Sequence, residues 1–297
     1  MYDVVVVGGG PAGLSAALML GRCRRRVLVC DVGEPRNRAT RALHGYLTRD
    51  GIPPREFLDL GRRELPEYGV EFRCVGVTGA VPVDDHYRIE LADGGEERTR
   101  YLLIATGVVD DLPGVRGFEE CYGRSVFHCP YCDGWEWRDT RIAAFGRGRH
   151  GIGLALGLRT WSRDTVLCTD GHPLGRHGRE RLARNGIAIR TGSIAHLEHQ
   201  DGRLTAIAFD SGDRLARDVI FFTTGQHPQS ELATRLGCRL THRGTVRTGT
   251  LCDTNVARVF VAGDASRDAQ FVVVAASEGV KAAVAINKAL QTEERAK

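Results

Sequence analysis

The chain has 297 residues, 42% of them hydrophobic, which is enough to bury two modest cores. Its 41 basic and 37 acidic residues are interleaved, so the net charge of +4 predicts no nucleic-acid partner. The first apolar run is too short to cross a bilayer and follows an acidic residue, so we expect a cytoplasmic protein with no signal peptide and no membrane span.

The N-terminal region is predicted to form a β-α-β unit. Val4 to Val7 is a continuous apolar run, typical of a strand covered on both faces. A helix rich in alanine and leucine follows over 14–20, and a second strand over 27–30. This alternation predicts a parallel sheet with crossover helices.

A glycine motif, Gly8-x-Gly10-x-x-Gly13, lies between the first strand and the helix, which is the context of a dinucleotide-binding turn. Its glycines allow a tight turn, close approach of a pyrophosphate and close packing of the helix. The helix N-terminus would offer N–H groups to the phosphates. Asp31 ends the second strand, about 20 residues further on, where a carboxylate binds a ribose hydroxyl.

The chain repeats this pattern around its midpoint. Strands over 142–145 and 166–168 flank an apolar helical stretch, which is preceded by Gly146-x-Gly148-x-x-Gly151. Asp170 follows the second of these strands, where it would repel the 2′-phosphate of NADPH but could bind the free 2′-hydroxyl of NADH. A working nicotinamide site and a vestigial one are both open at this point.

Two further strands, over 101–104 and 219–222, each end in a Thr-Gly step. We interpret these ends as the points where the chain enters and leaves an inserted domain. The predicted fold class is α/β, with two three-layer Rossmann-like domains and the second inserted into the first. The outer domain is predicted over 1–112 and 223–297, and the inserted domain over 113–222.

Cys129 and Cys132 are the only two of nine cysteines at two-residue spacing. This spacing allows a reversible disulfide and can lower a thiol pKa. Asp133 could shuttle the accompanying proton, and His128 could do the same or stabilise a thiolate. A zinc site would need two more ligands, and a purely structural disulfide is disfavoured in a cytosolic chain. The other seven cysteines are expected to be ordinary core or surface residues.

In combination, these motifs resemble the thioredoxin reductase-like FAD-dependent pyridine nucleotide-disulfide oxidoreductases of class II. The resemblance covers both glycine motifs, the Ala-Thr-Gly step at 105–107 that follows the strand over 101–104, the stretch 128–134, and Gly263-Asp264 followed by Ala269-Gln270. It implies that the outer domain binds FAD and that the inserted, NAD(P)-binding-like domain carries the cysteine pair. It also implies a homodimer and a rotation between the domains.

The resemblance further implies that Cys132 meets the flavin, that Cys129 meets the substrate and that Asp133 is the acid/base. No metal ligand is predicted. The residues that it implies in FAD binding are Gly8, Gly10, Pro11, Ala12, Gly13, Asp31, Arg36, Asn37, His44, Thr106, Gly107, Gly263, Asp264, Ala269 and Gln270. For an NAD(P)H molecule, whose use stays open, they are Gly146, Gly148, Gly151 and Asp170.

Three functions are compatible with these features. The first is NAD(P)H-driven reduction of a disulfide in a thioredoxin-like protein or a small molecule. The second is a dithiol oxidase that passes electrons to oxygen, because the stretch 129–138, with His44-Gly45 and Arg49-Asp50-Gly51, is similar to the gliotoxin and holomycin branch. That branch usually has histidine in place of Asp133. The third is a non-catalytic flavin- or zinc-binding module.

Overall fold

The computed structural model describes residues 1–266 and 269–296 and divides the chain into two compact units. The first unit comprises Met1–Arg38, Pro54–Val109 and the chain from His227 onward, and the second comprises Ala39–Pro53 and Asp110–Gln226. The segment 39–53, which the sequence analysis placed in the outer domain, therefore clusters with the second unit. Two connecting strands, β7 (Val108–Asp110) and β16 (Gln226–Pro228), pair with each other.

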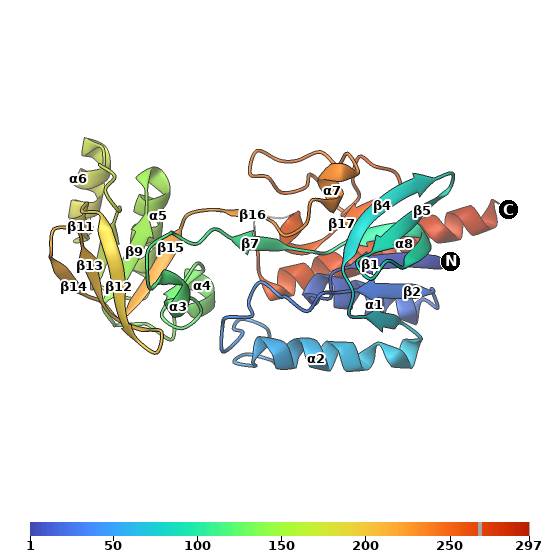
Figure 1. Cartoon of the computed structure of the whole chain (residues 1–297), viewed down its shortest axis with the longest axis horizontal. Helices are drawn as coiled ribbons and strands as arrows, with labels where there is room; N and C mark the ends of the chain where they lie inside the picture. Colours follow the sequence, from blue (N-terminus) through green and yellow to red (C-terminus); the bar gives the residue numbers. More distant parts are fainter. Residues whose placement is uncertain (267–268, 297) are drawn as a thin grey trace. The chain divides into compact units, whose positions relative to one another are not determined.

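The first unit is built on a seven-stranded sheet (Figure 1). Its strands are β1 (Tyr2–Val7), β2 (Val27–Cys30), β3 (Glu71–Arg73), β4 (Val77–Val83), β5 (His86–Leu91), β6 (Glu96–Ile104) and β17 (Val259–Val261). β4 and β5 extend the sheet as antiparallel strands, whereas the other five are parallel. β1 and β2 are buried almost throughout, as parallel strands covered on both faces require.

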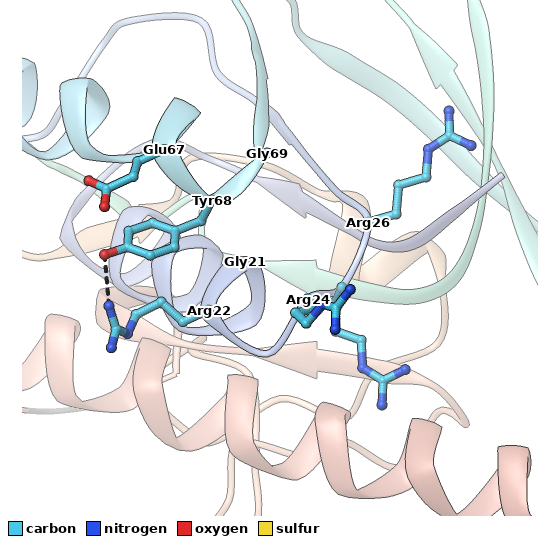
Figure 2. A pocket seen from close by; sticks show the side chains of 8 residues that line it. Gly21, Arg22, Arg24, Arg26, Glu67, Tyr68 and Gly69 are labelled. Atoms are coloured by element: carbon cyan, nitrogen blue, oxygen red, sulfur yellow. Dashed lines mark hydrogen bonds between the residues drawn. The ribbon is translucent and has the colours of Figure 1, made fainter.

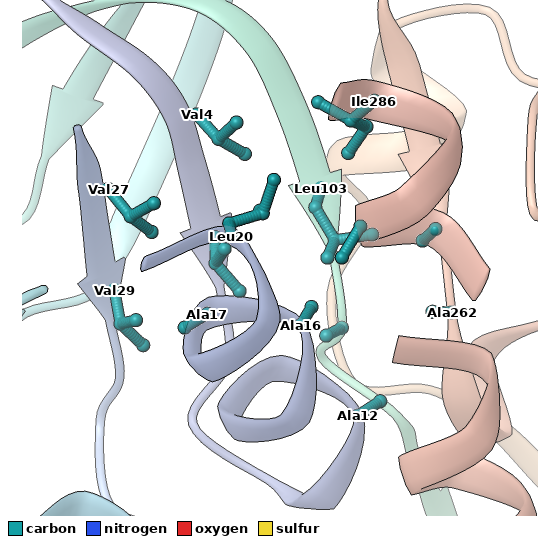
Figure 3. Packing of buried hydrophobic residues seen from close by; sticks show 14 of the residues in the cluster. Val4, Ala12, Ala16, Ala17, Leu20, Val27, Val29, Leu103, Ala262 and Ile286 are labelled. Carbon is teal, nitrogen blue, oxygen red and sulfur yellow. The ribbon is translucent and has the colours of Figure 1, made fainter. Parts of the chain in front are cut away.

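Helices cover one face of this sheet. α1 and α8 pack on each other, and Figure 3 shows Ala17 and Leu20 of α1 facing Val27 and Val29 of β2, and Ile286 of α8 beside Leu103 of β6. Alternate strand residues, such as Val5 and Val7, join a second apolar cluster on the other face. The helical elements of this unit are α1 (Pro11–Arg22), α2 (Pro54–Glu64), η1 (Pro66–Tyr68), α7 (Leu232–Arg235), η2 (Gly263–Ala265) and α8 (Val272–Arg295).

The second unit has three layers. A parallel sheet with the strand order β11-β10-β9-β15-β8 separates the helices α5 and α6 from an antiparallel sheet, β12-β13-β14. Its strands are β8 (Val126–Phe127), β9 (Ile142–Gly146), β10 (Thr165–Cys168), β11 (Ala188–Arg190), β12 (Ile194–Gln200), β13 (Arg203–Phe209), β14 (Arg214–Ala216) and β15 (Val219–Thr223). Its helices are α3 (Phe118–Cys121), α4 (Pro130–Asp133), α5 (Gly148–Leu158) and α6 (Arg176–Arg184). The predicted α/β class with two Rossmann-like domains is confirmed.

A shallow hollow of about 580 Å³ lies at the C-terminal end of α1 (Figure 2). Its lining residues are Gly21, Arg22, Arg24, Arg25, Arg26, Glu67, Tyr68 and Gly69. Arg22 donates a hydrogen bond to the Tyr68 hydroxyl at 2.7 Å, and Arg25 donates to the side chain of Asn287 at 2.7 Å. Figure 2 shows that Arg26 points away from Arg22, so the guanidinium groups do not converge on one point.

In the described part of the chain, no helix combines the length and the apolar character needed to cross a bilayer.

Candidate active site

The turn between β1 and α1 has the shape that close approach of a phosphate requires. Gly8 has a φ of +107°, and a Cβ there would lie 2.4 Å from the Ala105 carbonyl oxygen. A Cβ on Gly13 would lie 1.9 Å from the Gly8 carbonyl oxygen, so the helix packs directly on the turn. Gly10 is the N-cap of α1, and a Cβ there would meet nothing within 4 Å. The N-cap position therefore borders open space, from which an anion could reach the free N–H groups at the start of the helix.

Asp31 lies beside this turn. Its Oδ1 accepts a hydrogen bond from the Gly9 N–H at 2.9 Å, and its Oδ2 pairs with Arg62 of α2 at 2.9 Å. A carboxylate oxygen can accept more than one hydrogen bond, so Asp31 could still bind a ribose hydroxyl. Arg62 was missed by the sequence analysis, because nothing in the pattern of α2 distinguishes it from the other arginines there.

Three of the predicted FAD residues from distant parts of the chain meet in the first unit. The Arg36 guanidinium donates to Asp264 at 2.9 Å and to the Gln270 side-chain oxygen at 2.7 Å. The others in this region that the structure describes are the half-buried Asn37, Thr106 and Gly107, and the exposed Ala269.

The turn that carries Asp264 is hydrogen-bonded to a buried carboxylate, that of Glu278. Gly263, with a φ of +79°, donates its N–H to Glu278 Oε2 at 2.8 Å, and the Ser266 hydroxyl lies 3.4 Å from the same oxygen. Glu278 is only 4% exposed. The sequence analysis missed it, although a charged residue on the buried face of an alanine-rich helix is a usable signal.

Cys129 and Cys132 are joined by a disulfide at the start of α4, with their Cα atoms 5.3 Å apart. Cys129 is the N-cap residue, and its sulfur accepts a hydrogen bond from the Cys132 N–H at 3.1 Å. A donated hydrogen bond stabilises the thiolate form of a cysteine. Of the seven other cysteines, none forms a disulfide, and five are buried. Within residues 1–266 and 269–296, no group of three or more metal-binding side chains is arranged around a common point.

Asp133 is the last residue of α4 and is half-buried. Burial raises the pKa of its carboxyl to about 7, against a lowering effect of the His44 charge, while Glu136 raises it further. A group with a pKa near the working pH is suited to hold and return a proton.

His44 belongs to the second unit, in the segment 39–53. Its Nδ1 lies 3.5 Å from Asp50 and its Nε2 lies 3.6 Å from Glu136. The sequence analysis associated His44 with FAD, whereas the structure places its ring nitrogens beside Asp50 and Glu136. Glu136 was missed, because its proximity to His44 depends on how the 39–53 segment packs.

His128 also has local partners. Its Nδ1 lies 3.2 Å from the Tyr122 hydroxyl and 3.5 Å from Asp110, and Tyr122 donates a hydrogen bond to Asp110 at 2.8 Å. The ring also packs against Phe222. These contacts fix the orientation of the imidazole next to Cys129 in the chain, and the sequence predicted neither Tyr122 nor Asp110.

The second glycine turn keeps its geometry. A Cβ on Gly151 would lie 2.4 Å from the Gly146 carbonyl oxygen, and Gly148, with a φ of +52°, faces open space. Asp170 is bound within the chain, because its Oδ1 accepts from the Ile194 N–H at 3.0 Å and its Oδ2 pairs with Arg147 at 3.2 Å.

The comparisons with known proteins agree with this geometry. Residues 2–279 match the family model described as pyridine nucleotide-disulphide oxidoreductase. The chain belongs to this family. The oxidoreductase is 32% identical to a probable thioredoxin reductase of Arthroderma benhamiae over 98% of its own length and 81% of the relative's. It is 28% identical to the thioredoxin reductase sirT of Leptosphaeria maculans, with 97% and 94% covered.

Two solved structures are similar to the oxidoreductase over nearly the whole chain. A putative thioredoxin reductase TrxB from Bacillus anthracis has a TM-score of 0.95 at 32% identity, with 99% of this chain and 100% of that chain covered. The protein HlmI has a TM-score of 0.95 at 35% identity, with 99% and 94% covered. The predicted resemblance to thioredoxin reductase-like enzymes is confirmed.

The oxidoreductase uses FAD, and the residues of its first unit fit this cofactor. The open turn at Gly10 leaves room for a pyrophosphate, Asp31 is placed for a ribose, and Arg36 and Asp264 form a polar pair suited to the ribityl chain. The protein is therefore an FAD-dependent thiol-disulfide oxidoreductase.

Proposed function

We propose that Cys129 and Cys132 exchange two electrons between bound FAD and a thiol or disulfide substrate, with Cys132 facing the flavin and Cys129 facing the substrate. The observation that carries this proposal is the disulfide itself, which lies next to a carboxyl group whose pKa is raised to about 7 by burial. Bound FAD supplies the two-electron exchange with the cysteine pair.

In the reductive direction, the Cys129 thiolate attacks one sulfur of the substrate disulfide, and the other substrate sulfur leaves and takes a proton. The Cys132 thiolate then attacks the sulfur of Cys129, which reforms the protein disulfide and releases the second substrate sulfur, which also takes a proton. The substrate gains two electrons and two protons, and the cysteine pair loses them. Asp133 holds and returns a proton at Cys132.

We favour this direction, with NAD(P)H as the electron source, because the curated relatives described above are named thioredoxin reductases. The substrate would be a disulfide in a thioredoxin-like protein or a small molecule. The same family relationship supports a homodimer, which light scattering of the purified protein tests.

The opposite direction is a second candidate, in which a substrate dithiol reduces the disulfide and oxygen takes the electrons to form hydrogen peroxide. The stretch 129–138, which is similar to the gliotoxin and holomycin branch, favours it. Asp170 would repel the 2′-phosphate of NADPH, although NADH would remain a possible reductant. Anaerobic bleaching of the flavin by NADH or NADPH supports the reductase, and bleaching by dithiols alone supports the oxidase.

Substitution of either cysteine tests the shared core of both candidates. In Cys129→Ser and Cys132→Ser variants, we expect the flavin to stay bound while its anaerobic bleaching by dithiothreitol slows by about 100-fold or more, because no disulfide is left to accept the electrons. The exposed free cysteine Cys74 gives a matched control, and Cys74→Ser should bleach at the wild-type rate. Full-rate bleaching in Cys129→Ser would show that the electrons take another route.

A further inference from the structure

The roles proposed above do not use the charged groups that surround Asp133. His44 lies between two carboxylates, with Nδ1 facing Asp50 and Nε2 facing Glu136. Glu136 follows α4, only three positions after Asp133 in the chain, whereas His44 comes from a loop almost ninety residues earlier. Residues from two separate segments therefore meet just after α4, the helix that Asp133 ends.

The loop that carries His44 is closed by its own hydrogen bonds. The Leu43 N–H donates to the Ile52 carbonyl at 2.8 Å, and the Gly51 N–H donates back to the Leu43 carbonyl at 2.8 Å. Asp50 Oδ1 accepts from the Gly45 N–H at 2.7 Å inside the loop. Leu43 is buried, so the loop is anchored directly before His44. These contacts give the imidazole a defined position.

The charges that act on Asp133 oppose each other. From the loop, the His44 charge lowers the pKa of Asp133, and from the chain after α4, the charge of Glu136 raises it. Asp50 faces His44 from the other side of the ring. The His44 side chain is 21% exposed, Glu136 40% and Asp50 70%, so the shielding from solvent that strengthens a charge interaction is greatest at His44.

We propose that His44 is a positioning residue for the redox chemistry, and that His44 and Glu136 act as an opposed pair that sets the proton occupancy of Asp133. This inference rests on the proposed function, in which Asp133 handles the proton of the cysteine pair. The loop at 43–52 thereby controls the pH range in which the disulfide exchanges electrons.

The test is the pH profile of anaerobic flavin bleaching by dithiothreitol, with rates divided by the dithiothreitol thiolate concentration. We expect the wild-type profile to contain an ionisation that Asp133→Asn removes. His44→Gln should move its midpoint to higher pH and Glu136→Gln should move it to lower pH, each by about half a pH unit or more. The double variant should return close to the wild-type midpoint.

A matched control exists in the first unit. His86 of β5 lies 3.5 Å from Asp85 through Nδ1, and its side chain is 15% exposed, much like His44. His86→Gln should leave the midpoint unchanged. An infrared titration of the protonated carboxyl band that is lost in Asp133→Asn gives the same midpoints without turnover.

The outcomes separate this inference from the proposed function. If Asp133→Asn removes the ionisation but His44→Gln and Glu136→Gln leave the midpoint in place, or move it in the same direction, the opposed pair is wrong and the proposed function stands. If dithiothreitol bleaches the wild-type flavin at no pH, the proposed function itself fails. Glu136 is exposed, so Glu136→Gln and its infrared midpoint decide the question even if His44→Gln does not fold.

Discussion

The proton chemistry of the site depends on one carboxyl group, Asp133. An ordinary surface aspartate is fully ionised at neutral pH and cannot donate a proton. Burial disfavours the charged form and raises the pKa of Asp133 to about 7, so both protonation states are populated at neutral pH. The same burial makes the ionised carboxylate costly to the fold.

This cost predicts a pH-dependent stability. The pKa of Asp133 is higher in the folded than in the unfolded chain, so its contribution is most favourable below the unfolded pKa of about 4 and is lost as the pH rises through about 7. The loss is at most roughly 4 kcal/mol. Asp133→Asn should therefore stabilise the protein at pH 8 relative to wild type, and more so than at pH 5, as measured by urea unfolding.

The control for this comparison is Glu119→Gln, an exposed carboxylate on α3 for which no such difference is expected. Stability curves of Asp133→Asn and wild type that run parallel between pH 5 and pH 8 would contradict the raised pKa.

Residues close together in the sequence were the ones that the sequence could predict. The pair Cys129 and Cys132 and the adjacent Asp133 were recognised because short spacing fixes their proximity. Glu136 and Glu278 were not, because their roles depend on which distant backbone or side chain packs against them. His44 was singled out for its motif, but its carboxylate partners depend on how the segment 39–53 is placed.

At the scale of elements, backbone contact between helices organises the first unit. α8 approaches α1 at Gly279, where a Cβ would lie 2.0 Å from the Ala12 carbonyl oxygen. This contact lies one residue from Glu278, which holds the turn of Asp264. Close packing of α1 and α8 thus fixes the glycine turn before α1 relative to the turn of Asp264, two parts of the predicted FAD site.

Gly279→Ala should therefore destabilise the protein by about 1 to 3 kcal/mol, since the added methyl group must push the helices apart. Gly153 of α5 offers the opposite case, because a Cβ there would meet nothing within 4 Å. Gly153→Ala should stabilise by roughly 0.5 to 1 kcal/mol through helix propensity alone. Chemical unfolding measures both, and equal effects of the two substitutions would contradict the packing described here.

The sequence predicted those elements whose pattern is local. The strands β1, β2, β9 and β10 and the helices α1 and α5 were identified from apolar runs and glycine turns, and the structure confirms them within a few residues at their ends. The antiparallel additions β4-β5 and β12-β13-β14 were not foreseen, because half-exposed strands such as β4 and β12 carry a weak apolar signal.

At the scale of the whole molecule, the chain combines two dinucleotide-type turns with one redox-active cysteine pair. The first turn is open at Gly10, and the second is open at Gly148 but is flanked by the ion pair of Arg147 and Asp170. The cysteine pair is thus the feature that both candidate directions of the reaction share, whichever reductant supplies the electrons.

The most direct test is an anaerobic titration of the purified yellow protein with dithiothreitol, followed by the visible absorbance of the flavin. The account predicts that the flavin band bleaches as dithiol is added and returns when oxygen is admitted, since electrons pass through Cys129 and Cys132 to FAD. A flavin band that stays unchanged with excess dithiol, in protein that retains its FAD, would contradict the account.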